Sequence, residues 1–113
     1  MTPTQEIIKS KAVCDVLNER ERQIKSEGWS AEHDDNHTDG ELAQAAGCYA
    51  LFGDPSGPYR HYVPAEWPWD RSWWKVTDYR RSLVKAAALL LAEIERVDRA
   101  NMGGDVPLTR EEG

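Results

Sequence analysis

The sequence predicts an all-α domain of three main helices in a small bundle, with a long ordered loop rich in tryptophan and proline between helices two and three. Apolar residues recur at helical spacing in three separate stretches, and capping residues precede these stretches. The segment between the second and third stretch holds four of the six prolines and four of the five tryptophans. We expect one domain over residues 1–100, with helices at about 4–26, 39–52 and 78–99, and a flexible acidic tail over 101–113.

The first helix is expected to begin at Thr4, whose side chain can cap the first turn. One face is apolar and the opposite face is solvated and includes Arg22. Gly28 is the expected stop signal. The apolar residues of this helix are Ile8, Val13, Val16, Leu17 and Ile24.

The second helix is expected to follow a polar loop over residues 29–37. Thr38 and Glu41 have the spacing of a capping box, in which each side chain reaches the other's backbone amide. Small apolar residues then recur at helical spacing, which allows a neighbouring helix to approach closely. These residues are Leu42, Ala45, Ala46, Tyr49 and Ala50.

The segment from 53 to 75 combines prolines with aromatic residues, which favours an ordered loop over a helix or a strand. Thr77 or Asp78 is expected to cap the third helix. Its middle is apolar nearly all round, as in a helix that is central in a bundle or lies against another chain. We therefore expect at least a homodimer, formed through this helix.

The composition of the chain argues against general nucleic-acid binding and against membrane binding. The 113 residues (12.8 kDa) carry 20 acidic and 14 basic side chains, a formal net charge of −6, which disfavours general nucleic-acid or membrane-surface binding. The longest strongly apolar run, over residues 86–92, is too short to cross a bilayer, and we expect a cytoplasmic protein with no membrane contact. Cys14 and Cys48 are expected to be reduced core thiols.

Two clusters could carry chemistry. Asp34, Asp35, His37 and Glu41 are side chains of the types that bind divalent cations, and Mg²⁺ or Mn²⁺ is the expected ion. The alternative is a solvated loop whose acids favour the start of the following helix.

The second cluster could hold a nucleotide or another small anion. Trp69, Trp73 and Trp74 could stack on a base or form a protein hot spot, with Arg71 and Lys75 near a phosphate. Arg81 and Lys85 stand in the first two turns of the third helix, where the helix dipole disfavours cations unless an anion compensates. The alternatives are an aromatic mini-core for the tryptophans, ion pairs with Asp78 or the 34–35 acids for the cations, and a Glu95–Arg99 pair on a solvated face.

Three motifs carry a family resemblance: ERERQ at 19–23 leading into Gly28 and Trp29, HTDGE at 37–41, and LVKAAA at 83–88 continuing into EIERVD at 93–98. Over residues 17–49 and 79–99 the chain resembles the MazG-like all-α nucleotide pyrophosphohydrolases of phages and bacteria. In that family two carboxylate pairs at i, i+3 spacing hold Mg²⁺ on a triphosphate. Here Glu41 is followed at that distance by Gln44, and Ser82 and Lys85 stand where the second pair is expected.

Two interpretations follow from this departure. If catalysis is retained, the acids and histidine of the first cluster hold the metal. If it is lost, Lys85 and Arg81 supply the positive charge, and the bundle binds a nucleotide or a similar anion. A different class of function is a phage-encoded acidic inhibitor that binds a host defence or replication protein through the tryptophan loop.

Overall fold

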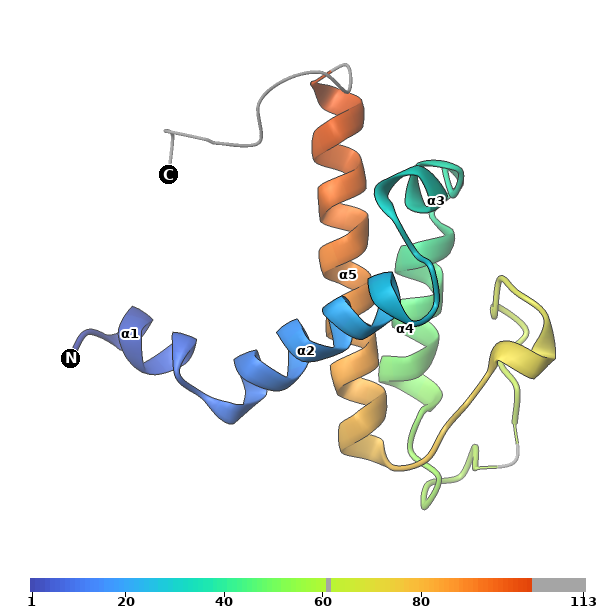
Figure 1. Ribbon diagram of the computed structural model, residues 1–113. Helices are drawn as coiled ribbons and strands as arrows, with labels where there is room; N and C mark the ends of the chain where they lie inside the picture. The colour runs from blue at the N-terminus through green and yellow to red at the C-terminus, as the bar shows by residue number, and fades with distance from the viewer. Residues whose placement is uncertain (61, 103–113) are drawn as a thin grey trace.

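The computed structural model describes residues 1–60 and 62–102, and this part of the chain is all-helical, as predicted (Figure 1). The central element is α5, which packs against α4, α2 and α3. The elements in chain order are α1 (Pro3–Ile8), α2 (Lys11–Lys25), α3 (Ala31–Asp35), α4 (Glu41–Phe52), a 3₁₀ turn η1 (Arg71–Trp73) and α5 (Tyr79–Asn101).

The first predicted helix is in fact two helices, because Ser10 interrupts it. Ser10 has an extended backbone, and its side chain accepts a hydrogen bond from the Val13 amide, so α2 starts anew after it. The first cap is Thr2 and not Thr4, since the Thr2 hydroxyl accepts from the Gln5 amide. Helix α1 buries no residue, and with the start of α2 it projects from the body as an arm (Figure 1).

The stop signal at Gly28 is confirmed. Gly28 has φ of 75°, a left-handed conformation, and the Trp29 amide then donates to the Gln23 carbonyl at 3.0 Å. The loop expected over 29–37 contains a short helix, α3, capped by Ser30. Its five residues carry no apolar periodicity, so the sequence pattern could not reveal it.

The predicted capping box of the second main helix is wrong. Helix α4 begins at Glu41 after a left-handed Gly40 with φ of 83° and no side-chain cap. The Glu41 carboxylate instead accepts from the Asp39 amide at 2.8 Å, which leaves Thr38 outside the helix. The apolar stripe is confirmed except at the exposed Ala50.

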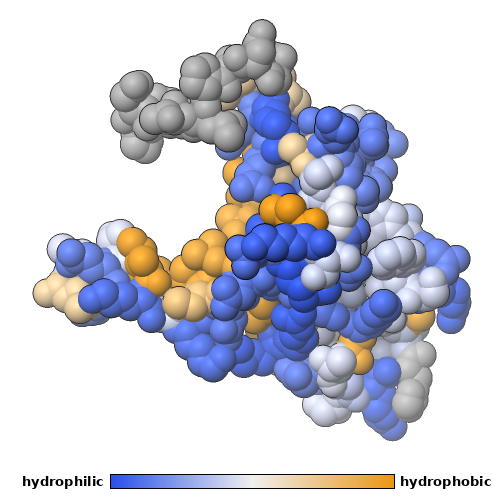
Figure 2. All heavy atoms as spheres, in the orientation of Figure 1, coloured by the Kyte–Doolittle hydropathy of each residue, from blue (hydrophilic) through white to orange (hydrophobic). Residues whose placement is uncertain are grey.

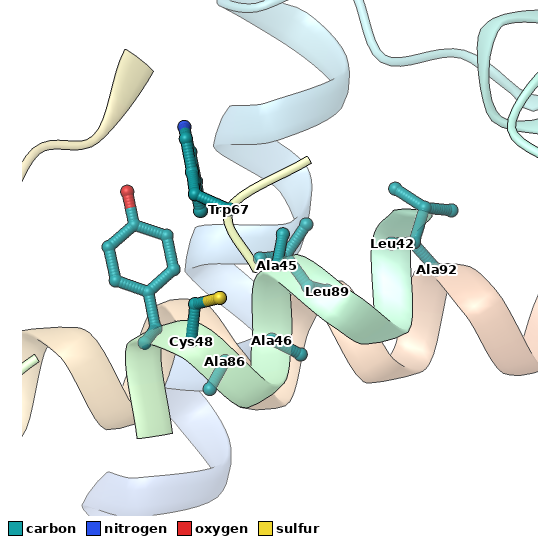
Figure 3. Packing of buried hydrophobic residues seen from close by; sticks show 9 residues of the cluster. Leu42, Ala45, Ala46, Cys48, Trp67, Ala86, Leu89 and Ala92 are labelled. Atoms are coloured by element: carbon teal, nitrogen blue, oxygen red, sulfur yellow. The ribbon is translucent and has the colours of Figure 1, made fainter. Parts of the chain in front are cut away.

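Small side chains let α4 and α5 pack closely. Ala45 and Ala46 of α4 face Ala86 and Ala92 of α5, and the rest of the buried cluster consists of Leu42, Cys48, Tyr49, Trp67 and Leu89 (Figure 3). At the end of α4 the Ser82 hydroxyl donates to the Gly53 carbonyl at 2.8 Å. This close packing fixes the position of α5 relative to the residues that follow α4.

The long loop is held by its own aromatic side chains. Trp67 is buried, its indole donates to the Asp70 carbonyl at 3.0 Å, and its ring lies 5.4 Å from Tyr49 and 4.9 Å from Trp74. The Asp70 carboxylate caps η1 by accepting from the Ser72 amide and hydroxyl, and these hydrogen bonds lower the pKa of Asp70. Trp73 follows directly and stays at the surface.

Asp78 caps α5 by accepting from the Arg81 amide at 2.8 Å, one of the two caps predicted. The predicted tail overlaps α5 at Asn101, and its residues 103–113 lie outside the described part of the chain. No helix within residues 1–60 and 62–102 is long and apolar enough to cross a membrane. Of the two cysteines, Cys48 is buried as expected, and burial raises the pKa of its thiol, whereas Cys14 is exposed.

Candidate functional site

Two adjoining cavities lie against the tryptophan loop, one bounded by α2, α4 and α5 and the other by α3 and the residues on either side of it, and Trp29 and Trp73 line both of them. We call them the charged cavity, of about 360 Å³, and the aromatic cavity, of about 290 Å³. The charged cavity is lined by Glu19, Arg22, Gln23, Glu27, Trp29, Tyr49, Trp73, Lys75, Thr77, Arg81, Lys85 and Leu89. The aromatic cavity is lined by Trp29, His33, His37, Trp69, Asp70 and Trp73.

Glu19 is the anchor of the charged cavity. Its residue is only 2% exposed, and its carboxylate accepts two hydrogen bonds from Arg22, both at 2.9 Å, and one from Arg81. Gln23 donates to the same carboxylate at 3.3 Å. Burial opposes the charge of Glu19, but the two guanidinium groups outweigh it and lower its pKa. Glu19 is therefore ionised at neutral pH and holds two arginines at the cavity wall.

The charged cavity has an excess of positive charge. The side chains that line it include two carboxylates, Glu19 and Glu27, and four cations: Arg22, Lys75, Arg81 and Lys85. The carboxylate of Glu27, like that of Glu19, is bound by Arg22, at 3.2 Å. The excess of two positive charges is a local exception in a protein whose net charge is −6. Such a cavity attracts a polyanion, because charges that face a recess are screened less than those on an open surface.

Lys85 has no carboxylate partner within ion-pair distance among the described residues. Its ammonium group donates to the Lys75 carbonyl at 2.7 Å and lies 5.3 Å from the centre of the Tyr49 ring. Burial, and then the nearby Arg81, lower the pKa of Lys85. An anion in the cavity would stabilise the charged form of this amine, because it would offset both effects.

The aromatic cavity is built from rings of two segments that are distant in sequence. Trp29 stacks on His33 with ring centres 5.8 Å apart and planes 3° from parallel, and Trp69 approaches Trp29 at 5.7 Å and His37 at 5.5 Å. The result is a recess with flat apolar walls. Such a recess fits a planar ring, with imidazole nitrogens and one carboxylate, Asp70, available for hydrogen bonds.

A buried ion pair holds the α3 side of the aromatic cavity. Asp34 of α3 is fully buried and accepts from Arg20 of α2 at 3.1 Å, while Arg20 also donates to Glu95 of α5 at 3.0 and 3.2 Å. The Nδ1 atom of the His33 ring lies 3.1 Å from the same Asp34 carboxylate. The ion pair thus ties three helices together and orients an imidazole toward the cavity.

Five of the seven predicted ligand residues line a cavity, and the other two do not. Lys75, Arg81, Lys85 and Trp73 line the charged cavity, and Trp69 and Trp73 line the aromatic cavity. The remaining two line neither: Trp74 stacks on Tyr49 at 4.7 Å against the core, and Arg71 is exposed on η1.

Ion pairing at the start of α5 involves different partners from those expected. Arg80 donates to Asp15 at 2.8 Å and Arg81 donates to Glu19, so acids of α2 compensate these cations in place of Asp78 or the 34–35 acids. Near the other end of α5, Arg99 donates to Asp35 of α3 at 2.8 and 3.0 Å and does not pair with Glu95. Acids on the crossing helices α2 and α3 thus lie within ion-pair distance of these three arginines.

The four predicted metal ligands do not come together. Asp34 is bound by Arg20, Asp35 is bound by Arg99, and only His37 and Glu41 lie near each other, at 3.6 Å. Across residues 1–60 and 62–102, no group of three or more His, Cys, Asp or Glu side chains has the arrangement of a metal site. This donor set, as arranged here, does not fit Mg²⁺ or Mn²⁺, which require several oxygen ligands around one point.

Several residues of the site were missed by sequence reasoning. The sequence pattern assigns Glu19 and Arg22 only to the first helix and to the ERERQ motif, with Arg22 on the solvated face, although their i, i+3 spacing is that of an ion pair. Trp29 was placed in a loop, and Tyr49 in the apolar stripe of the second helix. Lys75, by contrast, is a candidate from the sequence to hold phosphate together with Arg71, and the fold adds that its backbone carbonyl accepts from Lys85.

A comparison of the chain with protein-family models, with curated proteins and with solved structures found no match.

Proposed function

We propose that this protein binds a nucleotide, with the phosphates in the charged cavity and the base in the aromatic cavity. The single observation that carries the proposal is that Lys85 and Trp73 line one cavity, and Trp73 also lines the next. A nucleotide combines a polyanion with a planar ring, and the two adjoining recesses match these two parts. The resemblance to the MazG-like pyrophosphohydrolases, noted from the sequence, points to the same ligand class.

The charges of the charged cavity favour binding over rapid hydrolysis. Both carboxylates of this cavity are bound by arginine, and the amine of Lys85 adds positive charge where a metal ion would otherwise neutralise a phosphate. The acids of α3 are also occupied by arginines. We therefore propose a nucleotide-binding protein on a MazG-like scaffold, in which metal-dependent pyrophosphohydrolase activity is at most residual.

The inhibitor alternative has less support. Of the four tryptophans of the loop, Trp67 is in the core, Trp74 packs against it, and Trp69 and Trp73 line concave cavities. A protein-binding hot spot needs its aromatic side chains on a surface that another protein can cover. The placement of these rings around the cavities fits a small molecule better.

Calorimetric titration of ATP and dATP into the wild type and Lys85→Met tests the proposal. We expect Lys85→Met to weaken binding at least tenfold, because the methionine side chain keeps the apolar stem and removes the charge. The matched control is Lys25→Met, since Lys25 is an exposed lysine of α2 that does not line either cavity. Equal affinity of Lys85→Met and wild type, or no heat with any nucleotide, would contradict the proposal.

Two further titrations in the same experiment separate the two cavities. Inorganic triphosphate should bind the wild type more weakly than ATP but should still depend on Lys85, whereas Trp69→Leu should weaken ATP and leave triphosphate unchanged. Assays of the same samples for pyrophosphate release in Mg²⁺ measure any catalysis. A rate that disappears in a Glu19→Gln variant that is still folded and still binds ATP with the wild-type affinity would indicate that the arginine-bound carboxylate is released for chemistry.

A further inference from the structure

A second surface of the molecule, away from both cavities, is apolar and exposed. On α5, five aliphatic residues follow one another at alternating spacings of four and three, and all are exposed or half-exposed: Leu83, Ala87, Leu90, Ile94 and Val97. This spacing places them on one side of the helix, and it is the pattern of a helix that packs along another helix. The buried residues of α5, such as Leu89 and Ala92, lie on other sides.

The N-terminal arm extends the same surface. Leu17 and Ile24 of α2 are 56% and 44% exposed, and Ile7 and Ile8 of α1 are 59% and 60% exposed. Between α2 and α5 lies a groove of about 420 Å³ whose lining consists of aliphatic residues, four from each helix. Figure 2 shows these hydrophobic side chains gathered in the concave angle between the arm and α5. We call the exposed residues of α1, α2 and α5 together the apolar face.

We propose that a second copy of this chain covers the apolar face, in a two-fold dimer in which Ile7 and Ile8 of each arm contact the aliphatic groove of the partner. Each chain carries both an exposed apolar arm and an exposed apolar groove. Helix α1 buries no residue against its own chain, so its isoleucines are free to contact a second copy. Reciprocal exchange of two complementary parts is what a two-fold interface requires.

The area of the apolar face is of the order that a stable dimer needs. Its eight larger aliphatic side chains, each roughly half exposed, offer about 250–500 Å² per copy, since a fully exposed side chain of this kind carries about 60–120 Å². A standard interface buries about 1,600 Å² in total, of which about 65% is apolar in homodimers. The apolar part is therefore about 1,000 Å², and two such faces supply about half of this area to all of it.

Charge does not oppose this pairing at close range. The residues that line the groove are all aliphatic. Asp15, which lies on α2 between Val13 and Leu17, accepts from Lys11 at 2.6 Å and from Arg80 at 2.8 Å. A second copy that covers the groove lining would therefore bury no unpaired charge there, which would otherwise be costly.

Sedimentation velocity over a hundredfold range of protein concentration tests the dimer. We expect the wild type to sediment as a dimer and Leu90→Glu to sediment as a monomer, with dissociation at least a hundredfold easier. Leu51→Glu is the matched control, because Leu51 is 72% exposed on α4 and is not part of the apolar face. Far-ultraviolet circular dichroism shows whether each variant keeps its helices.

A double variant of the arm keeps the test decisive if Leu90→Glu fails to fold. Ile7→Glu/Ile8→Glu changes a helix that buries nothing in its own chain, so it cannot remove a buried core contact. We expect it to weaken the dimer at least tenfold while thermal unfolding of the monomer stays unchanged. A wild type that is monomeric throughout, or a dimer that survives Leu90→Glu or the double variant in folded form, would overturn the proposal.

Discussion

At the scale of single residues, the buried carboxylate of Glu19 decides much of the site's electrostatics. It holds Arg22 and Arg81 at the wall of the charged cavity, and it does so from inside α2, where a lone charge would be strongly disfavoured. Its hydrogen bonds to both guanidinium groups make it a fixed anion. The same contacts make it a determinant of stability.

We predict that Glu19→Gln destabilises the fold by about 1–3 kcal/mol at pH 7, because two arginines lose a charged acceptor whose own side chain is almost fully buried. The size of this destabilisation should also depend on pH, and the direction of the pKa shift of Glu19 determines how. The folded state lowers the pKa of Glu19, so its stabilising effect is complete above the ordinary glutamate pKa of about 4.3 and is lost as pH falls through the lower folded value.

Urea unfolding of wild type and variant at several pH values between neutral and strongly acidic measures this prediction. The difference in unfolding free energy should be constant from pH 7 to about 5 and should shrink at lower pH. Glu21→Gln is the control, because Glu21 lies on the exposed side of the same helix and, among the residues that the structure describes, pairs with Lys25 alone, at 3.4 Å. A difference that stays constant down to pH 2 would contradict the assigned role.

At the scale of elements, the contact between the end of α4 and the start of α5 sets the positions of Arg81 and Lys85. Gly53 lies directly against the side chain of Ser82, and a methyl group added at Gly53 would meet Ser82 Cβ and the Tyr49 carbonyl at distances that atoms do not reach without movement. The hydrogen bond from Ser82 to the Gly53 carbonyl completes this close approach. Ser82 is thus a packing residue and does not line the charged cavity.

Gly53→Ala should therefore destabilise the protein by about 1–3 kcal/mol, since backbone atoms must shift to make room. Gly47→Ala is a matched control in the same region. Gly47 lies within α4 with open space around the position of an added methyl group, so alanine there should stabilise the helix by about 0.5–1 kcal/mol. Thermal unfolding of both variants measures the two opposite effects; equal shifts would show that the close approach is unimportant.

Some features of the helices could be predicted from the sequence pattern, and others could not. The stripe of α4, the Gly28 stop and the Asp78 cap were predictable because each depends on neighbours along the chain. The break at Ser10 and the left-handed Gly40 were not, because the polar residues on both sides permit several caps and the choice between them depends on packing. Helix α3 could not be predicted either, because it is held by a contact between residues distant in sequence: Arg20 binds Asp34, fourteen residues later.

For the whole molecule, the site could be predicted only in part. Lys85 and Trp73 were expected in one ligand site, and the structure places both in one cavity. Their neighbours Glu19, Trp29 and Tyr49 come from elsewhere in the chain, and no local pattern shows that these residues converge. The arrangement of the four predicted metal ligands also depends on residues distant in sequence. Arginines from α2 and α5 bind the two acids of α3, Asp34 and Asp35.

The two proposed activities use opposite sides of α5. Arg81, Lys85 and Leu89 line the charged cavity, whereas Leu83, Leu90 and Ile94 define the apolar face. At 100° per residue, the first three residues lie roughly half a turn around the helix from the other three. A ligand on one side therefore makes no contact with a partner chain on the other.

We predict that ligand binding and dimer formation are independent. Linkage requires that if the nucleotide does not distinguish monomer from dimer, the monomer–dimer equilibrium does not change when nucleotide is added. Leu90→Glu should therefore bind ATP within about a factor of two of the wild type, which corresponds to about 0.4 kcal/mol. Calorimetry on the variant, and sedimentation of the wild type with and without saturating ATP, measure the two sides of the same coupling. A tenfold change in either would mean that α5 transmits binding between its two faces, since reciprocity demands that both change together.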